Sequence, residues 1–437
     1  MPKTCMSCKA VSESGKGYRE ISVFTPGEYC PACVPKVRAT GAGLSVLFFP
    51  VLPLMAWLIM QFGKPEDRMV GWGIINVSLV ILFQWLVIFP HELGHALTAR
   101  ALGKRVHKIV WGIGPLLFSF PMLGGTVEVH AYPFGGWTLS TDPIEKGYRL
   151  RKFLSVAGGP LVNLLLLGFA YPFVPQPNPF KGVLTTWQPW TAFAIANVIV
   201  LFWNLLPGQL RGSELASDGL NLLRIPFLSP SEVRNLRSIH YLIEGLGAMT
   251  EKQLEEALRW NREGLRLFPE SVPIRNNLAV TQARLGLYEL ARDEFKAVAG
   301  LAGVDPEFLA LAQSNIAFTD LMLDRPEFFE EAERLSTESM RHLAWMPFVR
   351  GTRGAVLISC GKIDEGLLLA KEAFERQDDP GQKAIDACFI ALGLRAKGRA
   401  DEGVKFLESA ERLSPGGVML PRVRKAYGRP EDSDSAQ

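Results

Sequence analysis

The sequence predicts a mainly α-helical fold: a polytopic membrane core flanked by two soluble ends. Three observations support this fold class. Four uncharged apolar stretches lie in the first half of the chain, and each has about the 20 residues that a helix needs to cross a bilayer. From about residue 229 the sequence becomes charged and shows paired helical patterns, and two close cysteine pairs precede the first apolar stretch. We predict spans at 43–62, 69–98, 153–174 and 186–207.

The bulk composition excludes some functional classes and bounds the domains. The 437 residues are 48% hydrophobic and carry a net charge of only +3, so the balance of charge indicates no nucleic-acid partner. We expect no signal peptide, because cysteines and charged residues precede the first apolar run. The changes in composition predict a zinc ribbon-like segment, a membrane core, helical repeats and a disordered tail, at 1–38, 39–228, 229–420 and 421–437.

A fifth uncharged run, 109–127, is interrupted by closely spaced glycine and proline residues. These residues argue against a spanning helix. We therefore predict a small membrane-associated β-region over 106–140, formed by short strands or by a re-entrant hairpin at the membrane surface.

Basic residues indicate the orientation of the membrane core. They are concentrated in the loop 98–152 and before the first span, whereas the opposite loops carry few. The positive-inside bias therefore places the long loop and both termini in the cytoplasm, and the architecture suggests a multi-pass protein of the bacterial inner membrane. Spans two and four both run toward the loop side, so residues at their C-terminal ends can meet at one depth.

Four cysteines near the N-terminus predict a structural zinc site. They form two Cys-x-x-Cys pairs, a spacing that lets each pair hold one side of a tetrahedral zinc ion. Two disulfides are the alternative, which a cytoplasmic placement disfavours. A thioredoxin-like redox pair is a weaker alternative, because no βαβ pattern surrounds either motif. The cysteines are Cys5, Cys8, Cys30 and Cys33.

The C-terminal half resembles about five tetratricopeptide-like repeats over 232–415. Apolar helical patterns recur about every 35 residues, with turn glycines inside the units and prolines at their ends. Such repeats stack as a solenoid with a concave groove, which suits a cytosolic protein or peptide partner. A helical domain with a purely structural role is the alternative.

The stretch "HELGH" places His91, Glu92 and His95 at the end of the second span. On a helix, the two histidines lie one turn apart on the same face, where both imidazoles can reach one zinc ion. Glu92 would then take a proton from a zinc-bound water, whose pKa the metal lowers toward neutrality. The alternative is a histidine pair at the end of a span, but ionisable residues inside a membrane are usually functional.

A catalytic zinc needs a third protein ligand and one open position. The segment after the fourth span supplies Glu214 and Asp218, on the same side of the membrane as His91. His107 and His130 in the intervening loop are further candidates. Spacing alone does not choose among these four residues.

The ordered motifs together resemble the site-2 protease family of intramembrane zinc metalloproteases. "HELGH" at the end of a span resembles the zinc helix of the family, and "WGIGP", "GGT" and "YPFGGW" resemble its membrane-associated β-region. "AGGPLVNLLL" is similar to its Gly-Pro-x-x-Asn span, and "NLLP" followed by "SDG" to its second zinc motif. The resemblance covers about 43–225.

The resemblance implies a role for each matching residue. His91 and His95 become zinc ligands and Glu92 the general base, while Asp218 becomes the third ligand, favoured over Glu214. Asn163 and Asn204 become polar groups near the site that orient substrate backbone or hold the oxyanion, although each could equally form an interhelical hydrogen bond. The segment from Pro207 to Asp218 is longer than in compact members of the family.

The expected function is therefore cleavage of membrane proteins in or near their transmembrane segments, with one catalytic zinc. The partners would be a transmembrane protein substrate and membrane lipid. A membrane scaffold with a structural metal, recruiting partners through the repeats, is the alternative. A soluble-type metalloprotease tethered to a membrane is disfavoured, because the candidate ligands flank spans.

Overall fold

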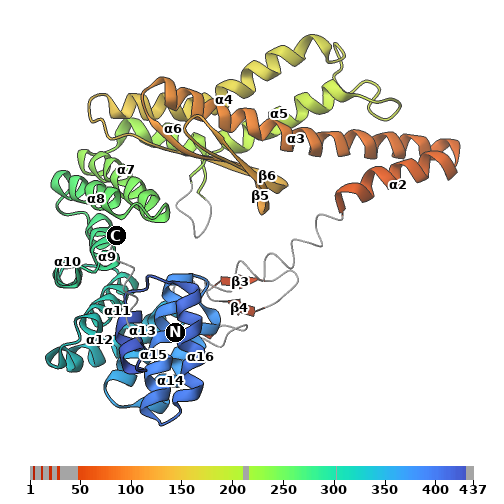
Figure 1. Cartoon of the computed structure of the whole chain (residues 1–437). Coiled ribbons are helices and arrows are strands. Elements are labelled where there is room, and N and C mark those ends of the chain that lie inside the picture. The colour runs from red at the N-terminus through yellow and green to blue at the C-terminus, as the bar shows by residue number, and fades with distance from the viewer. Residues whose placement is uncertain are drawn as a thin grey trace. The chain divides into compact units, whose positions relative to one another are not determined.

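The computed structural model describes residues 3–4, 11–12, 19–21, 27–29, 48–209, 216–301 and 303–429. The chain divides into two compact units (Figure 1). We call residues 38–240 the apolar unit, and residues 241–437 together with 1–37 the solenoid unit.

Four long apolar helices dominate the apolar unit, and each coincides with one of the predicted spans. By length and composition, two stretches among the described residues can cross a membrane: Pro65–Ala101 and Tyr148–Phe173. The other two apolar helices are shorter, so the four-span core stays a prediction. The helices are α2 (Phe48–Phe62), α3 (Arg68–Ala101), α4 (Tyr148–Ala170), α5 (Pro189–Leu205) and α6 (Asp218–Arg224), with the short 3-10 helices η1 (Pro65–Asp67), η2 (Tyr171–Phe173) and η3 (Ile225–Phe227).

Helix α3 is the centre of this unit, since it packs against α2, α4, α5 and the β-hairpin. It continues through Pro90 without a break. Its closest approach to α4 is at Gly94 and Gly158, where a Cβ atom added to either glycine would lie 2.5 Å from the carbonyl oxygen of the other. Only glycine allows this contact, which brings the histidine-bearing end of α3 against α4.

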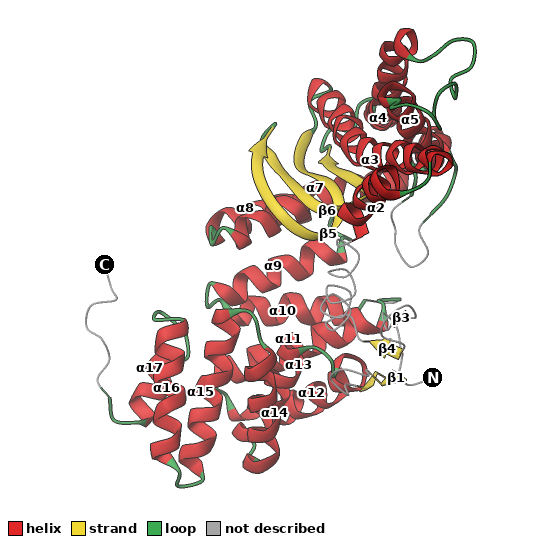
Figure 2. Ribbon diagram, turned by 90° about the vertical axis from the view of Figure 1, so that its right-hand side faces the viewer, coloured by secondary structure: helices red, strands yellow, loops and turns green. Residues whose placement is uncertain are grey.

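The predicted β-region is one long antiparallel hairpin rather than several short strands. Strands β5 (Arg105–Met122) and β6 (Gly125–Thr141) are joined at Leu123 and Gly124, which both have positive φ angles, as tight hairpin turns require. The ribbon folds on itself, because 108–111 has partners in both 126–129 and 136–139. Figure 2 shows the resulting curvature.

The hairpin packs against the C-terminal half of α3. Ala96 and Ala99 of the helix share a buried apolar cluster with Val106, Ile109 and Val127 of the strands. Alternation of apolar side chains along each strand supplies one buried face for this contact. The contact fixes β6 beside the HELGH segment.

The solenoid unit consists of antiparallel helix pairs stacked in chain order (Figure 2). The predicted tetratricopeptide-like repeats are thereby confirmed as five pairs of helices. The first helix of the first pair, α7, begins in the apolar unit. The helices are α7 (Pro230–Thr250), α8 (Leu254–Leu267), α9 (Val272–Arg284), α10 (Tyr288–Ala299), α11 (Pro306–Leu323), α12 (Phe329–Leu343), α13 (Pro347–Ser359), α14 (Ile363–Arg376), α15 (Pro380–Ala396), α16 (Ala400–Leu413) and the final α17 (Leu420–Ala426), with the 3-10 helix η4 (Pro326–Phe328).

One residue with a positive φ angle ends the first helix of every pair. These residues are Lys252, Gly286, Asp324, Gly361 and Gly398, with φ between 53° and 84°. Glycine adopts this left-handed conformation most readily, whereas lysine and aspartate do so at a cost. The sequence revealed only the three glycine turns, because the other two units use residues that carry no such signal.

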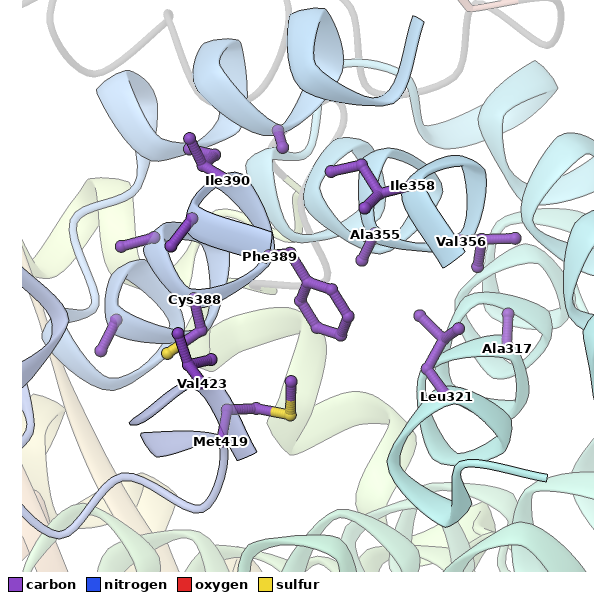
Figure 3. Close-up of a cluster of buried hydrophobic side chains, with 14 of the residues drawn as sticks. Ala317, Leu321, Ala355, Val356, Ile358, Cys388, Phe389, Ile390, Met419 and Val423 are labelled. Carbon is purple, nitrogen blue, oxygen red and sulfur yellow. The ribbon is translucent and has the colours of Figure 1, made fainter. Parts of the chain in front are cut away.

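The core of the solenoid unit alternates small and large side chains. Alanines on facing helices are fully buried, among them Ala317 and Ala355, and allow the close approach of neighbouring helices. Phe389 of α15 lies in the same buried cluster as residues of α11, α13 and α17 (Figure 3). This packing holds successive pairs in one continuous core.

One boundary prediction is wrong. The disordered tail was predicted from residue 421, yet residues up to Ala426 form α17. Val423 of this helix is fully buried in the solenoid core, because apolar residues at helical spacing, beginning at Leu420, continue past the last repeat. Residues 430–437 lie outside the described part of the chain.

The N-terminal segment has two short strand pairs. Strand β1 (Lys3–Thr4) pairs with β2 (Val11–Ser12), and β3 (Arg19–Ile21) pairs with β4 (Gly27–Tyr29), both antiparallel. The four N-terminal cysteines lie outside the described residues, so the structural zinc site stays a prediction.

Candidate metal centre

Helix α3 positions the first two candidate ligands. His91 and His95 lie one turn apart, and both are near the end of the helix that packs on α4 and β6. His91 is 1% exposed, and the side chain of His95 is 12% exposed. The Nε2 atoms of the two imidazoles are 3.2 Å apart, so the helical spacing brings both toward one point as predicted.

Asp218 reaches the same point from a distant segment. It is the first residue of α6, and Ser217 caps this helix by accepting a hydrogen bond from the backbone N–H of Leu220. The Ser217 hydroxyl also donates to the Leu206 carbonyl at the end of α5. These bonds tie the start of α6 to the end of α5.

The extra residues between Pro207 and Asp218 do not displace the aspartate. Gln209 and Ala216 form an antiparallel bridge, and the N–H of Ser217 donates to the Gly208 carbonyl. The two described ends of this segment, 208–209 and 216–217, therefore lie side by side. A longer loop is compatible with the short distance, because its two ends are joined.

The donor atoms of these three residues fit a zinc ion. Asp218 Oδ2 lies 3.1 Å from His91 Nε2 and 3.2 Å from His95 Nε2. Two ligand atoms at about 2.0–2.1 Å from a tetrahedral zinc lie roughly 3.4 Å apart. All three distances are near this value, and the nitrogen and carboxylate donors are those that zinc accepts.

A chain of amides fixes the tautomer of His91. The Nδ1–H group of His91 donates to Asn163 Oδ1, and Asn163 Nδ2 donates to Asn197 Oδ1 at 3.1 Å. Asn197 in turn donates to the carbonyl of Phe193 at 2.9 Å. Because every amide is oriented by the next, the Nδ1 atom of His91 carries the proton and its Nε2 atom presents a lone pair toward Asp218.

The backbone of α4 orients His95. Its Nδ1–H group donates to the carbonyl of Ser155 at 2.9 Å, which leaves Nε2 free to bind a metal. Gly159, one turn further along α4, lies close to the imidazole rings of His91 and His95. A Cβ atom at this position would be 2.3 Å from His95 Nε2 and 2.8 Å from His91 Nε2. No side chain fits there without moving the candidate ligands.

Glu92 faces the hairpin beside the two histidines. It is 5% exposed, and its Oε2 atom accepts a hydrogen bond of 2.9 Å from the hydroxyl of Thr138 on β6. The same hydroxyl contacts the backbone carbonyl of Glu92 at 3.0 Å. Gly136 brings the strand close, since a Cβ atom there would lie 2.9 Å from Glu92 Cγ. The carboxylate is therefore held in place by β6.

The electrostatic environment keeps Asp218 ionised. Burial raises the pKa of this carboxyl group, but when the two imidazoles are protonated, their hydrogen bonds and positive charges outweigh burial and lower the pKa to about 2. An ionised carboxylate is the form that binds a divalent metal.

The other predicted residues lie elsewhere. Asn204 donates to the carbonyl of Val200 within α5. His107 interacts with Thr141, and His130 with the carbonyl of Gly114. Glu214 lies outside the described residues.

Sequence reasoning missed four residues that support the site, because spacing carries no signal for a residue that acts by holding another side chain. Asn197 lies two turns before Asn204 on α5, and only the three-dimensional contact distinguishes them. The four residues are Thr138, Ser155, Gly159 and Asn197.

The protein-family comparison covers the segment that builds most of this geometry. Residues 78–178 match the model of peptidase family M50, the site-2 proteases. We call residues 78–178 the M50 segment. The predicted resemblance is thereby confirmed for this part of the chain, which contains His91, Glu92, His95 and Asn163.

Bacterial relatives of this chain carry provisional names as zinc metalloproteases. One from Campylobacter jejuni is 29% identical over 109 residues, which cover 22% of this chain and 29% of that protein. Another from Chlamydia trachomatis is 30% identical over 119 residues, covering 22% of this chain and 19% of that protein. The chain thus spans less than a third of the length of these relatives.

Solved structures similar to this chain are tetratricopeptide-repeat proteins. One from Thermus thermophilus is 21% identical, with a TM-score of 0.35, and covers 44% of this chain and 97% of its own. The protein YrrB, described with an unusual peptide-binding site, is 18% identical with a TM-score of 0.29. The match covers 43% of this chain and 92% of YrrB. At these scores the two likenesses add nothing to the helix pairs described above.

Proposed function

We propose that this chain is a zinc metalloprotease that hydrolyses peptide bonds in or near the transmembrane segments of membrane proteins. The observation that carries the proposal is the convergence of His91, His95 and Asp218. Two segments more than 120 residues apart place three donor atoms within 3.2 Å of one another, and the Nδ1 atoms of both imidazoles are engaged elsewhere, by Asn163 and Ser155.

Each residue has a distinct role in the proposed reaction. His91, His95 and Asp218 would hold the zinc through three donor atoms. Zinc, when bound, would supply an activated water and polarise the scissile carbonyl. Glu92 accepts the proton of the attacking water, and Thr138 holds its carboxylate for this task. Asn163 orients His91, so we assign it a positioning role, and Asn204 remains a candidate for contact with substrate backbone.

The membrane setting of the site supports an intramembrane substrate. His91, Glu92 and His95 lie inside the apolar stretch Pro65–Ala101, one of the two that can cross a membrane. The four predicted spans, the cytoplasmic termini and the bacterial inner membrane belong to this proposal. The relatives named above are all bacterial, which agrees with it.

The soluble parts would select the substrate. Helix pairs of this kind form extended surfaces for protein or peptide partners. The N-terminal cysteines would hold a second, structural zinc and add a small folded module. Both would recruit or gate a transmembrane protein near the membrane surface.

The variant Glu92→Gln tests the proposed chemistry, because it keeps size and polarity but removes the base. Membrane proteins from cells that express each form are compared by mass spectrometry of their N-terminal peptides. We expect new N-termini within or beside apolar segments with the unsubstituted chain, and none with Glu92→Gln. The control is Glu128→Gln, which makes the same chemical change on the hairpin, where Glu128 binds Lys108.

The same comparison distinguishes the alternative. If the unsubstituted chain and Glu92→Gln produce identical sets of N-termini, the proposed reaction is refuted. A non-proteolytic membrane scaffold with a structural metal would then account for the site.

A further inference from the structure

Lys104 is a buried ammonium group that the proposed reaction does not use. It lies between α3 and β5 and is only 6% exposed. Its backbone N–H donates to the carbonyl of Ala99, which fixes the chain at the end of α3. A buried charge is costly unless it is paired or hydrogen-bonded, so its partners show what the residue does.

The ammonium group is directed at a single hydroxyl. Lys104 Nζ donates to Ser155 Oγ at 2.8 Å. The negative charge of Asp142 attracts Lys104, but the Asp142 carboxylate forms its ion pair with Arg151, with 2.8 Å between Oδ2 and Nε. Within the described part of the chain, no carboxylate lies in ion-pair contact with Lys104. Burial lowers the pKa of Lys104 to about 8, and the nearby charges of Lys152 and Arg151 contribute to this shift.

Ser155 connects this ammonium group to the metal centre. Its hydroxyl accepts from Lys104 and donates to the carbonyl of Lys152 at 3.0 Å. Its own carbonyl accepts the Nδ1–H group of His95. One residue of α4 therefore bonds both to the charged side chain and to a candidate ligand. The same bonds hold the end of α3 and the start of α4 in register.

We infer that Lys104 is a positioning residue of the metal centre, which acts through Ser155 to orient His95. The inference rests on the proposed function, because it takes His95 as a ligand. The ammonium group restricts the Ser155 hydroxyl and with it the second turn of α4, and the Ser155 carbonyl then directs His95 Nε2 toward Asp218. Residues that orient ligands in this way change metal affinity typically about 10–100-fold.

The test measures zinc affinity in the full-length chain by competition with a chromophoric chelator. Zinc that the Asp218→Asn variant still binds is subtracted, so the N-terminal cysteines do not contribute. We expect Lys104→Met to weaken the remaining site by about tenfold, the lower end of the range for such residues. Lys104→Arg, which retains the charge, should recover part of the loss.

Lys108→Met is the matched control, since it removes one positive charge four residues along the chain, where the side chain binds Glu128. We expect no change in its zinc affinity. Ser155→Ala should weaken binding as Lys104→Met does, and the double variant should be no weaker than either, because both changes break one connection. The double variant also removes both polar partners together, which protects folding against a lone buried charge.

Cobalt in place of zinc provides a second measurement, its visible absorption spectrum. A Lys104 that only stabilised the fold would leave this spectrum unchanged. The visible absorption of the Asp218-dependent cobalt reports the geometry of its ligands, and we expect Lys104→Met and Ser155→Ala to alter it in the same way. If Lys104→Met and Ser155→Ala left the cobalt spectrum unchanged, and their zinc affinity lay within about twofold of that of Lys108→Met, the role of Lys104 would be refuted. The proposed function would not be affected by that result. If the unsubstituted chain bound no Asp218-dependent metal, the proposed function would fall with the role of Lys104.

Discussion

The metal centre of the apolar unit and the core of the solenoid unit differ in how they bury some of their polar side chains. In the apolar unit, the buried polar groups around His91 are each bonded to a polar atom of another element, as Asn163 and Asn197 are. In the solenoid unit, several buried polar atoms have no hydrogen-bond partner among the described residues. They include Ser314 Oγ, Thr352 Oγ1 and Asp386 Oδ2.

This difference indicates which interactions matter most in each place. Buried polar groups cost free energy unless they are paired, so a fully connected set is kept where its geometry matters. The apolar unit uses such a set to aim three donors at one point. The solenoid unit instead depends on a continuous apolar core, which tolerates a few unpaired atoms. Substitutions should therefore change metal binding in one unit and unfolding in the other.

The largest effect is expected from Gly159→Ala. A methyl group there would lie 2.3 Å from His95 Nε2 and must displace both imidazoles. We expect the variant to lose its Asp218-dependent zinc and its proteolysis, which metal analysis of the purified protein measures. Gly168→Ala on the same helix is the control, because no atom lies within 4 Å of its added Cβ. Full zinc binding by Gly159→Ala would show that the two rings are not held as described.

A core substitution in the solenoid unit should give the next largest effect. Phe389 is 1% exposed, and truncation to alanine leaves a cavity that costs about 3–5 kcal/mol of unfolding free energy. Chemical denaturation followed by circular dichroism measures this loss, while the zinc of the apolar unit should stay bound. Leu368→Ala, at an exposed position of α14, should change stability by less than about 0.5 kcal/mol. Parallel loss of zinc and solenoid stability would contradict the separation of the two units.

A third prediction separates two asparagines. Asn163→Ala removes the acceptor that fixes the tautomer of His91, so zinc affinity should fall by about 10–100-fold. Asn204→Ala should leave zinc affinity unchanged, because Asn204 bonds to its own helix. Chelator competition measures both. Equal losses in the two variants would argue against an orienting role specific to Asn163.

The smallest effect concerns Asp386. Burial raises the pKa of its carboxyl group well above the ordinary value, so its ionised form destabilises the folded solenoid. The stability that this group contributes is present at acid pH and is lost as pH rises through the raised pKa. Asp386→Asn should therefore be more stable than the unsubstituted chain at pH 7, by about 1–2 kcal/mol. The difference should shrink as pH falls.

Denaturation of Asp386→Asn at several pH values tests this sign. Asp364→Asn, which changes an exposed carboxylate on α14, should show a much smaller effect at every pH. A stability difference for Asp386→Asn that grew toward acid pH would contradict the assignment.

The sequence predicted those parts of the site that depend on local spacing. His91, Glu92 and His95 follow from a helical period, and the apolar stretches mark all four long helices of the apolar unit. Asp218 lies more than 120 residues away. The predicted topology made it one of four candidate ligands, and only the resemblance to a family favoured it over the others. The two non-glycine turns of the solenoid, Lys252 and Asp324, left no signal because neither residue type marks a left-handed conformation as glycine does.

Supporting residues could not be predicted for a related reason. Asn197 and Asn204 are both asparagines on one face of α5, about 10 Å apart along the helix axis. Only the depth at which α4 places Asn163 decides which of them joins the chain to His91. Similarly, Thr138 acts because the hairpin folds onto α3, a contact that no local pattern encodes.

The count of zinc ions in the purified full-length chain tests the central claim most directly. The account predicts that Asp218→Asn and His91→Ala each lose the same single equivalent of zinc, while Glu214→Gln keeps it and Cys30→Ser loses a different one. Retention of the full zinc content by Asp218→Asn would show that the two segments do not share one ion. The metalloprotease assignment would then be contradicted.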